Sequence, residues 1–304
     1  MENKKRLIFI FGPTGVGKTR LAVNVSEGIG EIISVDSMQV YRGLDIGTAK
    51  PGEEERRRVP HHLIDIVPPD YRFSAGDFRR LALKAIDEIY GRMRIPVLVG
   101  GTGLYFRALE HSLIEAPPAD LALRRSLYTE EEMEKGRLYR KLFEVDPETA
   151  RKLHPNDLVR IIRALEVHAL TGIRLSDFLK MKDQRKFEIL KIGIITDRKL
   201  LYSAIEERCR EMVNRGLGGE VYRLLMQGYT EECPSMKGLG YSHFIQYFKG
   251  CYSFKEVLRL FQRDTKHYAK RQLTWFRREK GTFWHGPDEF QQVRERIEAF
   301  MAKR

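Results

Sequence analysis

Strand-like apolar runs alternate with amphipathic segments over the first hundred residues. Leu7–Phe11, Glu31–Val35 and Ile95–Val99 have the length and composition of buried strands. Lys18–Glu27 has helical spacing, and a second helix is expected to run from Ser74 to about Tyr90, because Ser74 and Asp77 have the spacing of a capping box. Strands that alternate with helices predict parallel pairing, so the fold class is α/β, a parallel sheet core flanked by helices.

The alternation stops at Ala116-Pro-Pro-Ala119. From Asp120 to about Arg185 the sequence is charged and has helical spacing, and Glu188–Thr196 then predicts another buried strand. A long amphipathic helix is expected near Lys199–Asn214, and the remainder is expected to be helical. We therefore expect two domains: a core formed by residues 1–115 and 190–304, and a helical insertion domain at 116–189.

The net charge of the chain indicates a class of binding partner. The 304 residues carry 54 Lys and Arg against 42 Asp and Glu, a net charge of +12. This balance favours a polyanionic partner, although an unspecialised basic surface has the same composition. No apolar run has the length of a membrane span and the N-terminus does not resemble a secretory signal, so we expect a cytoplasmic protein with no membrane contact.

Three cysteines, Cys209, Cys233 and Cys251, are scattered without a CxxC pair. Such spacing indicates neither a disulfide framework nor a zinc site. We expect these cysteines to be packing residues.

A phosphate-binding loop follows the first strand. It matches G-x-x-x-x-G-K-[ST] and comprises Gly12, Pro13, Thr14, Gly15, Val16, Gly17, Lys18 and Thr19. The motif stands between a strand and a helix, which is the context that it requires. Its backbone amides can hold phosphate oxygens, Lys18 adds a positive charge, and the Thr19 hydroxyl can bind Mg²⁺. The sequence therefore predicts a P-loop NTPase-like core.

Two further polar turns follow the second and third predicted strands. They are Asp36-Ser-Met-Gln39 and Gly100–Tyr105, and in parallel sheets ligands bind beyond the carboxyl ends of the strands. Asp36 therefore lies within reach of the P-loop. Its carboxylate is a candidate Mg²⁺-linked group or a general base, and the alternative is a helix cap or turn residue.

Two segments have the composition of RNA contacts. Between Arg263 and Lys280 there are seven Lys or Arg against two acids, interleaved with aromatic residues that include Trp275. Such a helix suits single-stranded nucleic acid, although a solvated cationic helix has a similar composition. A second helix opens at Asn156 and exposes Arg160 and Arg163 on one side, which fits either an ordinary amphipathic helix or an RNA contact.

The motifs together resemble the bacterial tRNA dimethylallyltransferases, also called tRNA isopentenyltransferases. The resemblance runs nearly end to end and rests on GPTGVGKT, DSMQVYRGLDIGTAKP, HHLID, FSAGDF, VLVGGTGLY, HPNDLVRIIRALEV, GLGY and AKRQLTWFR. The chain departs from the family at Ser242-His243, where a basic residue and then Gln or Glu are common. It also departs at Val159-Arg160, where the family has Gln-Arg.

The resemblance implies transfer of a dimethylallyl group from dimethylallyl diphosphate to N6 of the adenosine immediately 3′ of the anticodon. It implies that Asp36 accepts the N6 proton, and that Lys18, Thr19 with Mg²⁺, the P-loop amides and Arg208 stabilise the departing diphosphate. The implied contacts to the tRNA anticodon stem-loop are Asp36, Ser37, Met38, Gln39, Thr102, Arg124, Val159, Arg160, Ile161, Ile162, Arg163, Lys237, Gly238, Leu239, Gly240, Tyr241, Ser242, Lys270, Arg271, Gln272, Leu273, Thr274, Trp275, Phe276 and Arg277. We expect a monomer.

Three other functions use parts of the same sequence. A P-loop metabolite kinase accounts for residues 1–105 but gives no role to the basic aromatic helix. An enzyme that prenylates free adenine nucleotides shares the core chemistry without needing a grip on RNA. An RNA-binding switch without catalysis would use the P-loop as a sensor, which leaves Asp36 unexplained.

Overall fold

The structure is a computed structural model that describes residues 4–110, 117–180 and 187–302. It divides into two compact units. The first comprises Met1–Glu110 and Lys186–Arg304, and the second comprises His111–Arg185. The second unit therefore interrupts the first in sequence, and each is described on its own below.

A single parallel sheet forms the centre of the first unit. Its strands are β1 (Lys5–Phe11), β2 (Gly30–Val35), β3 (His61–His62), β4 (Ile95–Gly100), β5 (Phe187–Ile194) and β6 (Thr282–His285). They are arranged in the order β3-β2-β4-β1-β5-β6, with every pair parallel. The expected α/β core is confirmed, and its three most apolar N-terminal runs are β1, β2 and β4.

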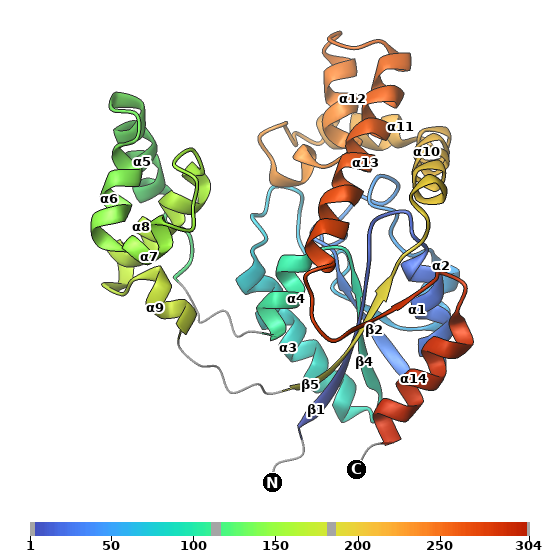
Figure 1. Ribbon diagram of the computed structural model, residues 1–304. Coiled ribbons are helices and arrows are strands. Elements are labelled where there is room, and N and C mark those ends of the chain that lie inside the picture. The colour runs from blue at the N-terminus through green and yellow to red at the C-terminus, as the bar shows by residue number, and fades with distance from the viewer. Residues whose placement is uncertain (1–3, 111–116, 181–186, 303–304) are drawn as a thin grey trace. The chain divides into compact units, whose positions relative to one another are not determined.

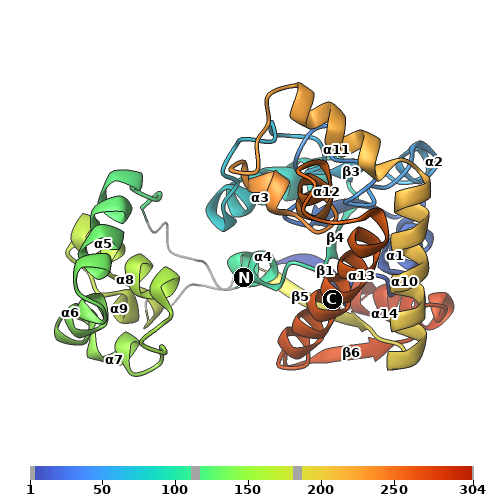
Figure 2. The same ribbon diagram turned by 90° about the horizontal axis from the view of Figure 1, so that it is seen from above.

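Burial on both faces explains why β1 is apolar from Leu7 to Phe11. Leu7, Phe9 and Phe11 pack on one face with α3 (Ala75–Gly91) and α4 (Gly103–Glu110), whereas Ile8 and Ile10 pack on the other with α1 (Lys18–Ser26) and α10 (Arg198–Asn214). None of these five side chains is more than 1% exposed. Helices therefore cover both sides of the sheet (Figures 1 and 2), as parallel sheets require.

The helices of the first unit are α1 (Lys18–Ser26), α2 (Glu53–Arg58), α3 (Ala75–Gly91), α4 (Gly103–Glu110), α10 (Arg198–Asn214), α11 (Leu217–Met226), η1 (Pro234–Lys237, a 3-10 turn), α12 (Tyr241–Phe248), α13 (Phe254–Phe276) and α14 (Phe290–Ala302). The capping box expected at α3 is present, since Asp77 N donates to Ser74 Oγ at 3.1 Å and Asp77 accepts from Ser74 N. Within the described residues no helix is long and apolar enough to cross a membrane.

The second unit is helical. It contains α5 (Leu121–Met133), α6 (Arg137–Val145), α7 (Pro147–Ala150), α8 (Leu158–Thr171) and α9 (Leu175–Lys180). Its core includes Leu138, Leu142 and Ile161, all fully buried. The cap of α8 is Asp157, whose carboxylate accepts from Arg160 N, and not Asn156.

Two expectations about the first unit are wrong. The C-terminal region is not entirely helical, because Thr282–His285 forms β6 beside β5. Four residues are too few to show the alternation of a strand, and their pairing with β5 makes them one. The expectation that Cys251 is a packing residue is also wrong, because Cys251 is exposed, whereas Cys209 is buried and the partly buried Cys233 packs against the core, as expected.

Candidate active site

A cavity of about 390 Å³ opens where β1, β2 and β4 end. Parallel strands leave a crevice at their carboxyl ends, because the chain must turn away from the sheet there. Elements far apart in the sequence close this crevice: the P-loop, the turn after β2, the loop before α2, α10 and α13. Its polar lining comprises Thr14, Lys18, Thr19, Ser34, Asp36, Ser37, Gln39, Thr48, His61, Arg208, Lys237, Thr265, Tyr268, Arg271 and Gln272.

The P-loop has the backbone shape that its glycines allow. Gly15 and Gly17 have φ values of 81° and 91°, in the left-handed region that favours glycine. Gly17 precedes α1 directly, so the free N–H groups of the first turn of α1 lie beside the loop. The Lys18 Nζ donates to Pro13 O at 2.7 Å, which places the ammonium across the loop. This arrangement provides an anion site.

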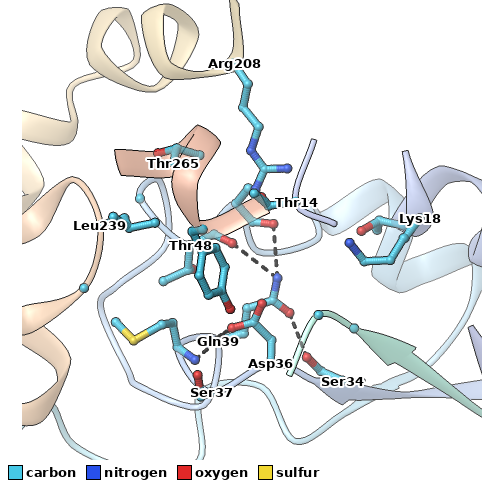
Figure 3. A pocket seen from close by; sticks show the side chains of 18 of the residues that line it. Thr14, Lys18, Ser34, Asp36, Ser37, Gln39, Thr48, Arg208, Leu239 and Thr265 are labelled. Carbon is cyan, nitrogen blue, oxygen red and sulfur yellow. Dashed lines mark hydrogen bonds between the residues drawn. The ribbon is translucent and has the colours of Figure 1, made fainter. Parts of the chain in front are cut away.

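Two cationic side chains face this anion site from different elements. Figure 3 shows Arg208 extending from α10 toward the P-loop, while Lys18 points into the same cavity. Burial and the nearby Arg208 lower the pKa of Lys18 to about 7, with Asp36 opposing them. Burial also lowers the pKa of Arg208. The protein therefore keeps two positive groups partly desolvated, and a diphosphate would stabilise the charged form of both.

Asp36 has both a structural and a chemical position. Its Oδ1 accepts from Met38 N at 2.8 Å and from Gln39 N at 3.3 Å, so the side chain closes the turn after β2. The same carboxylate lines the cavity and interacts electrostatically with Lys18 and Arg208. The turn thus fixes a carboxylate beside the anion site, where it can accept a proton from a bound substrate.

Gln39 and Thr102 hold the walls beside Asp36. Ser34 Oγ donates to Gln39 Oε1 at 2.8 Å, and the Gln39 amide donates to Thr48 O at 3.3 Å (Figure 3). Thr102 Oγ1 accepts from Ser37 N at 3.1 Å. Both residues were expected among the RNA contacts, and in the structure both tie the turn after β2 to neighbouring segments.

Gln272 joins the P-loop to the turn after β4. Its Oε1 accepts from Thr14 N at 2.8 Å and its Nε2 donates to Gly101 O at 2.9 Å. A Cβ at Gly101 would lie 2.2 Å from this Nε2, so only glycine permits the contact. The Gln272 side chain therefore joins two loops of the cavity that it also lines, and its expected contact with RNA stays a prediction.

The other residues of the basic helix separate into exposed and packed groups. Lys270, Arg271 and Arg277 are exposed, and Arg271 also lines the cavity. Phe276 is 1% exposed and stacks on Phe11 at 4.6 Å, so its side chain belongs to the core. Its place among the RNA contacts is therefore corrected.

Trp275 and Tyr241 are also packed. Trp275 lies partly buried against the core, with the Arg107 guanidinium 4.5 Å from its ring centre. Tyr241 is fully buried and donates to Glu220. Both rings therefore have a packing role, and the expected RNA contact of Trp275 stays a prediction.

The candidate residues of the second unit separate in the same way. Val159 and Arg160 are exposed on α8, whereas Ile161 and Ile162 are buried in the unit's own core. The side chains of Ile161 and Ile162 therefore pack α8 against the rest of the second unit and are not exposed to a partner.

Arg124 and Arg163 both pair with Glu166. Arg124 makes two hydrogen bonds of 2.8 Å to this carboxylate, which is fully buried. Arg163 Nη1 donates to it at 2.5 Å. Since a buried carboxylate needs partners, both arginines have a structural role in addition to any contact with RNA.

Sequence reasoning missed Glu220 and Tyr268. Glu220 stands in an ordinary amphipathic pattern on α11, but its carboxylate accepts hydrogen bonds from three successive backbone amides of the segment after β2. Tyr268 lines the cavity, and burial together with Asp36 raises its pKa. A buried acid cannot be recognised from a helical pattern, whereas Tyr268 stands one residue before the AKRQLTWFR motif, within the basic aromatic segment already noted.

Comparison with known proteins assigns this P-loop α/β fold to one class. The family model described as IPP transferase matches residues 39–279, and one described as isopentenyl transferase matches residues 5–65. The chain is 47% identical to tRNA dimethylallyltransferase 2 of Geotalea uraniireducens, covering 99% of both chains. It is 48% identical to the tRNA dimethylallyltransferase of Geobacter metallireducens, covering 93% of both.

Solved structures agree. A tRNA isopentenylpyrophosphate transferase from Bacillus halodurans is 40% identical with a TM-score of 0.73, over 98% of this chain and 96% of that one. A eukaryotic dimethylallyltransferase acting on tRNA is 26% identical with a TM-score of 0.84, over 98% of this chain and 77% of that one. The class is thus a P-loop-fold transferase. The chain belongs to the tRNA dimethylallyltransferase family, as its motifs predicted.

Proposed function

We propose that this enzyme transfers the dimethylallyl group of dimethylallyl diphosphate to N6 of the adenosine immediately 3′ of the anticodon in tRNA. One observation carries the proposal: a single cavity is lined by a P-loop, two desolvated cations and an oriented carboxylate. This set matches the two halves of the reaction, departure of an anionic leaving group and removal of a proton from the nucleophile.

The reaction balances as a substitution at the allylic carbon. The N6 lone pair forms a bond to C1 of the allyl group, and the C1–O bond breaks with its electron pair leaving on diphosphate. Asp36 accepts the proton that N6 loses, because the turn after β2 holds its carboxylate in the cavity. Lys18, Arg208 and the P-loop amides stabilise the charge that grows on the leaving oxygen.

The residues present fit a Mg²⁺ ion. The Thr19 hydroxyl lines the cavity beside the anion site and is a hard oxygen donor. Within residues 4–110, 117–180 and 187–302 there is no cluster of three His, Cys, Asp or Glu residues that could hold a metal by themselves. The remaining ligands would therefore be diphosphate oxygens and water. When bound, Mg²⁺ supplies further neutralisation of the diphosphate charge.

The RNA is bound by exposed residues around the cavity and on the insertion. Lys270, Arg271 and Arg277 are exposed on the basic helix, and Lys237 is exposed at the edge of the cavity. Arg160 supplies a further exposed cation on the helical unit, which we assign as a tRNA-contacting domain. Taking the target base out of its stack costs about a few kcal/mol, which these contacts offset. We expect the enzyme to act as a monomer.

A labelling assay tests this function against its alternatives. The protein is incubated with radiolabelled dimethylallyl diphosphate and with unmodified tRNA, with an anticodon stem-loop, or with AMP. Label in both RNAs but not in AMP is expected. Label in AMP alone would replace the proposal with free-nucleotide prenylation. Phosphate transfer from ATP with no prenyl transfer would favour the kinase.

A further inference from the structure

His243 lies in the first turn of α12, where the structure gives it two buried contacts. It is the third residue of α12 and is 7% exposed. Its Nδ1 accepts from Gly240 N at 3.2 Å, and its Nε2 lies 3.1 Å from Asp264 Oδ2 on α13. The ring also packs against Phe261, with 5.7 Å between ring centres.

These contacts specify one protonation state. A backbone N–H can only donate, so Nδ1 must carry a lone pair and no proton. The neutral ring then carries its proton on Nε2, where it donates to the Asp264 carboxylate. Asp264 is held in turn by Arg263 at 2.8 Å, and His267 lies 4.0 Å from it.

The hydrogen bond between Gly240 N and His243 Nδ1 lies at one end of a wall of the cavity. Its φ of 86° turns the chain from the cavity wall into α12, and a Cβ there would lie 2.9 Å from Leu217 Cδ2. The wall itself includes Lys237, Gly238 and Leu239, all of which line the cavity. The bond between Gly240 N and the imidazole therefore fixes the end of this wall.

We infer that His243 is a positioning residue: its Nδ1 lone pair holds Gly240 N–H and keeps the Lys237–Tyr241 wall in place, while Asp264 selects the tautomer. A protonated ring would oppose Nδ1–H to Gly240 N–H, and the wall would lose this bond. Binding of the stem-loop thus depends on a neutral imidazole that does not itself contact the RNA. The kinetic part of this inference rests on the proposed function, whereas the tautomer and the backbone contact do not.

Two variants separate the lone pair from the bulk of the ring. His243→Phe keeps a ring of similar size but removes the acceptor, whereas His243→Gln keeps an oxygen acceptor at a position where Gln is a usual helix-capping residue. One hydrogen bond changes an equilibrium by roughly two- to tenfold. For His243→Phe we expect Gly240 amide exchange to accelerate about tenfold and KM for the stem-loop to rise about five- to tenfold, with kcat nearly unchanged. His243→Gln should restore both.

Nitrogen NMR of the intact wild-type protein, with His243 assigned from its missing signal in His243→Gln, tests the tautomer even if His243→Phe folds poorly. A proton on Nε2 and none on Nδ1 at about pH 8 supports the inference. A proton on Nδ1, or equal exchange and KM changes in His243→Phe and His243→Gln, overturns it. If no RNA is prenylated by the wild-type enzyme, the proposed function fails, while amide exchange and NMR still decide the role of His243.

Discussion

Tyr241 donates its hydroxyl hydrogen to Glu220 across 2.6 Å, and both side chains are buried. The same carboxylate accepts from the backbone N–H groups of Asp45, Ile46 and Gly47 at 3.1, 2.8 and 3.2 Å. One acid on α11 therefore joins the segment after β2 to the start of α12. Burial and the adjacent Glu220 raise the pKa of Tyr241, so its phenol remains a hydrogen donor.

Removing this donor should weaken the fold. Tyr241→Phe deletes one hydrogen bond to a buried carboxylate, so we expect a loss of about 1–3 kcal/mol in the free energy of unfolding. Urea denaturation measures this loss. Tyr222→Phe is the matched control, because Tyr222 is exposed and should change stability little. Equal effects of the two variants would show that the Glu220 contact contributes nothing.

Asp36→Asn tests the general base. The amide keeps the shape of the side chain but does not take up a proton, so single-turnover transfer should fall by roughly 10²–10⁴. Affinity for tRNA should change far less. The exposed Asp70→Asn provides a control for loss of one surface charge. A rate within about threefold of wild type would remove Asp36 from this role.

Lys18→Ala tests the donor site. The variant should lose dimethylallyl diphosphate affinity and transfer rate, on the order of 10²–10³ together, because the leaving oxygen loses a positive partner. Equilibrium binding of labelled donor and single-turnover kinetics measure the two losses. Binding of tRNA should survive. A donor affinity equal to that of wild type would place the diphosphate elsewhere.

Proton uptake provides a second test of Lys18. Its pKa of about 7 means that the free enzyme at about pH 8 holds Lys18 mostly neutral, whereas at about pH 6 the group is already protonated. A bound diphosphate favours the ammonium form, so binding should take up close to one proton at about pH 8 and almost none at about pH 6. Calorimetry in buffers of different ionisation enthalpy measures this. Lys18→Ala subtracts the donor's own titration, and an unchanged uptake in that variant would contradict the assignment.

The basic helix should determine the salt dependence of RNA binding. Replacing Lys270, Arg271 and Arg277 with Gln should weaken tRNA binding and reduce the slope of log affinity against log salt by about two units or slightly more. Because Arg271 lines the cavity, the double variant of Lys270 and Arg277 is the cleaner test of unchanged donor affinity. Arg259→Gln, which removes an arginine paired with Glu256 on the same helix, is the control. An unchanged slope in the triple variant would place the RNA on another surface.

Trp275 should contribute to folding more than to base stacking. Its ring packs against the core, and a Cβ at Gly103 would lie 2.2 Å from its Nε1. We expect Trp275→Ala to cost roughly 2–4 kcal/mol in the free energy of unfolding, with a smaller loss for Trp275→Phe. Thermal and urea melts measure both. A variant that keeps wild-type stability but loses RNA affinity would restore the stacking role.

The amino-acid sequence by itself determined the alternation of strands and helices, the P-loop with Lys18, the carboxylate at Asp36 and the family. These are local properties, because each depends only on residues close together in the chain. Examples are an apolar run, a glycine that allows positive φ and a motif of fixed spacing. Burial on both faces gives β1 a continuous apolar run from Leu7 to Phe11, which is why the sequence predicts a buried strand there.

Only the tertiary structure decided which polar side chains face the cavity and which are internal ties. Gln272 and Arg271 are adjacent on α13, yet one hydrogen-bonds two loops while the other is exposed. Glu220, His243 and the short strand β6 depend on partners more than twenty residues away in sequence. Helical spacing assigns a residue to one face of a helix. Which residues pack against that face depends on distant parts of the chain, and the local pattern carries no information about them.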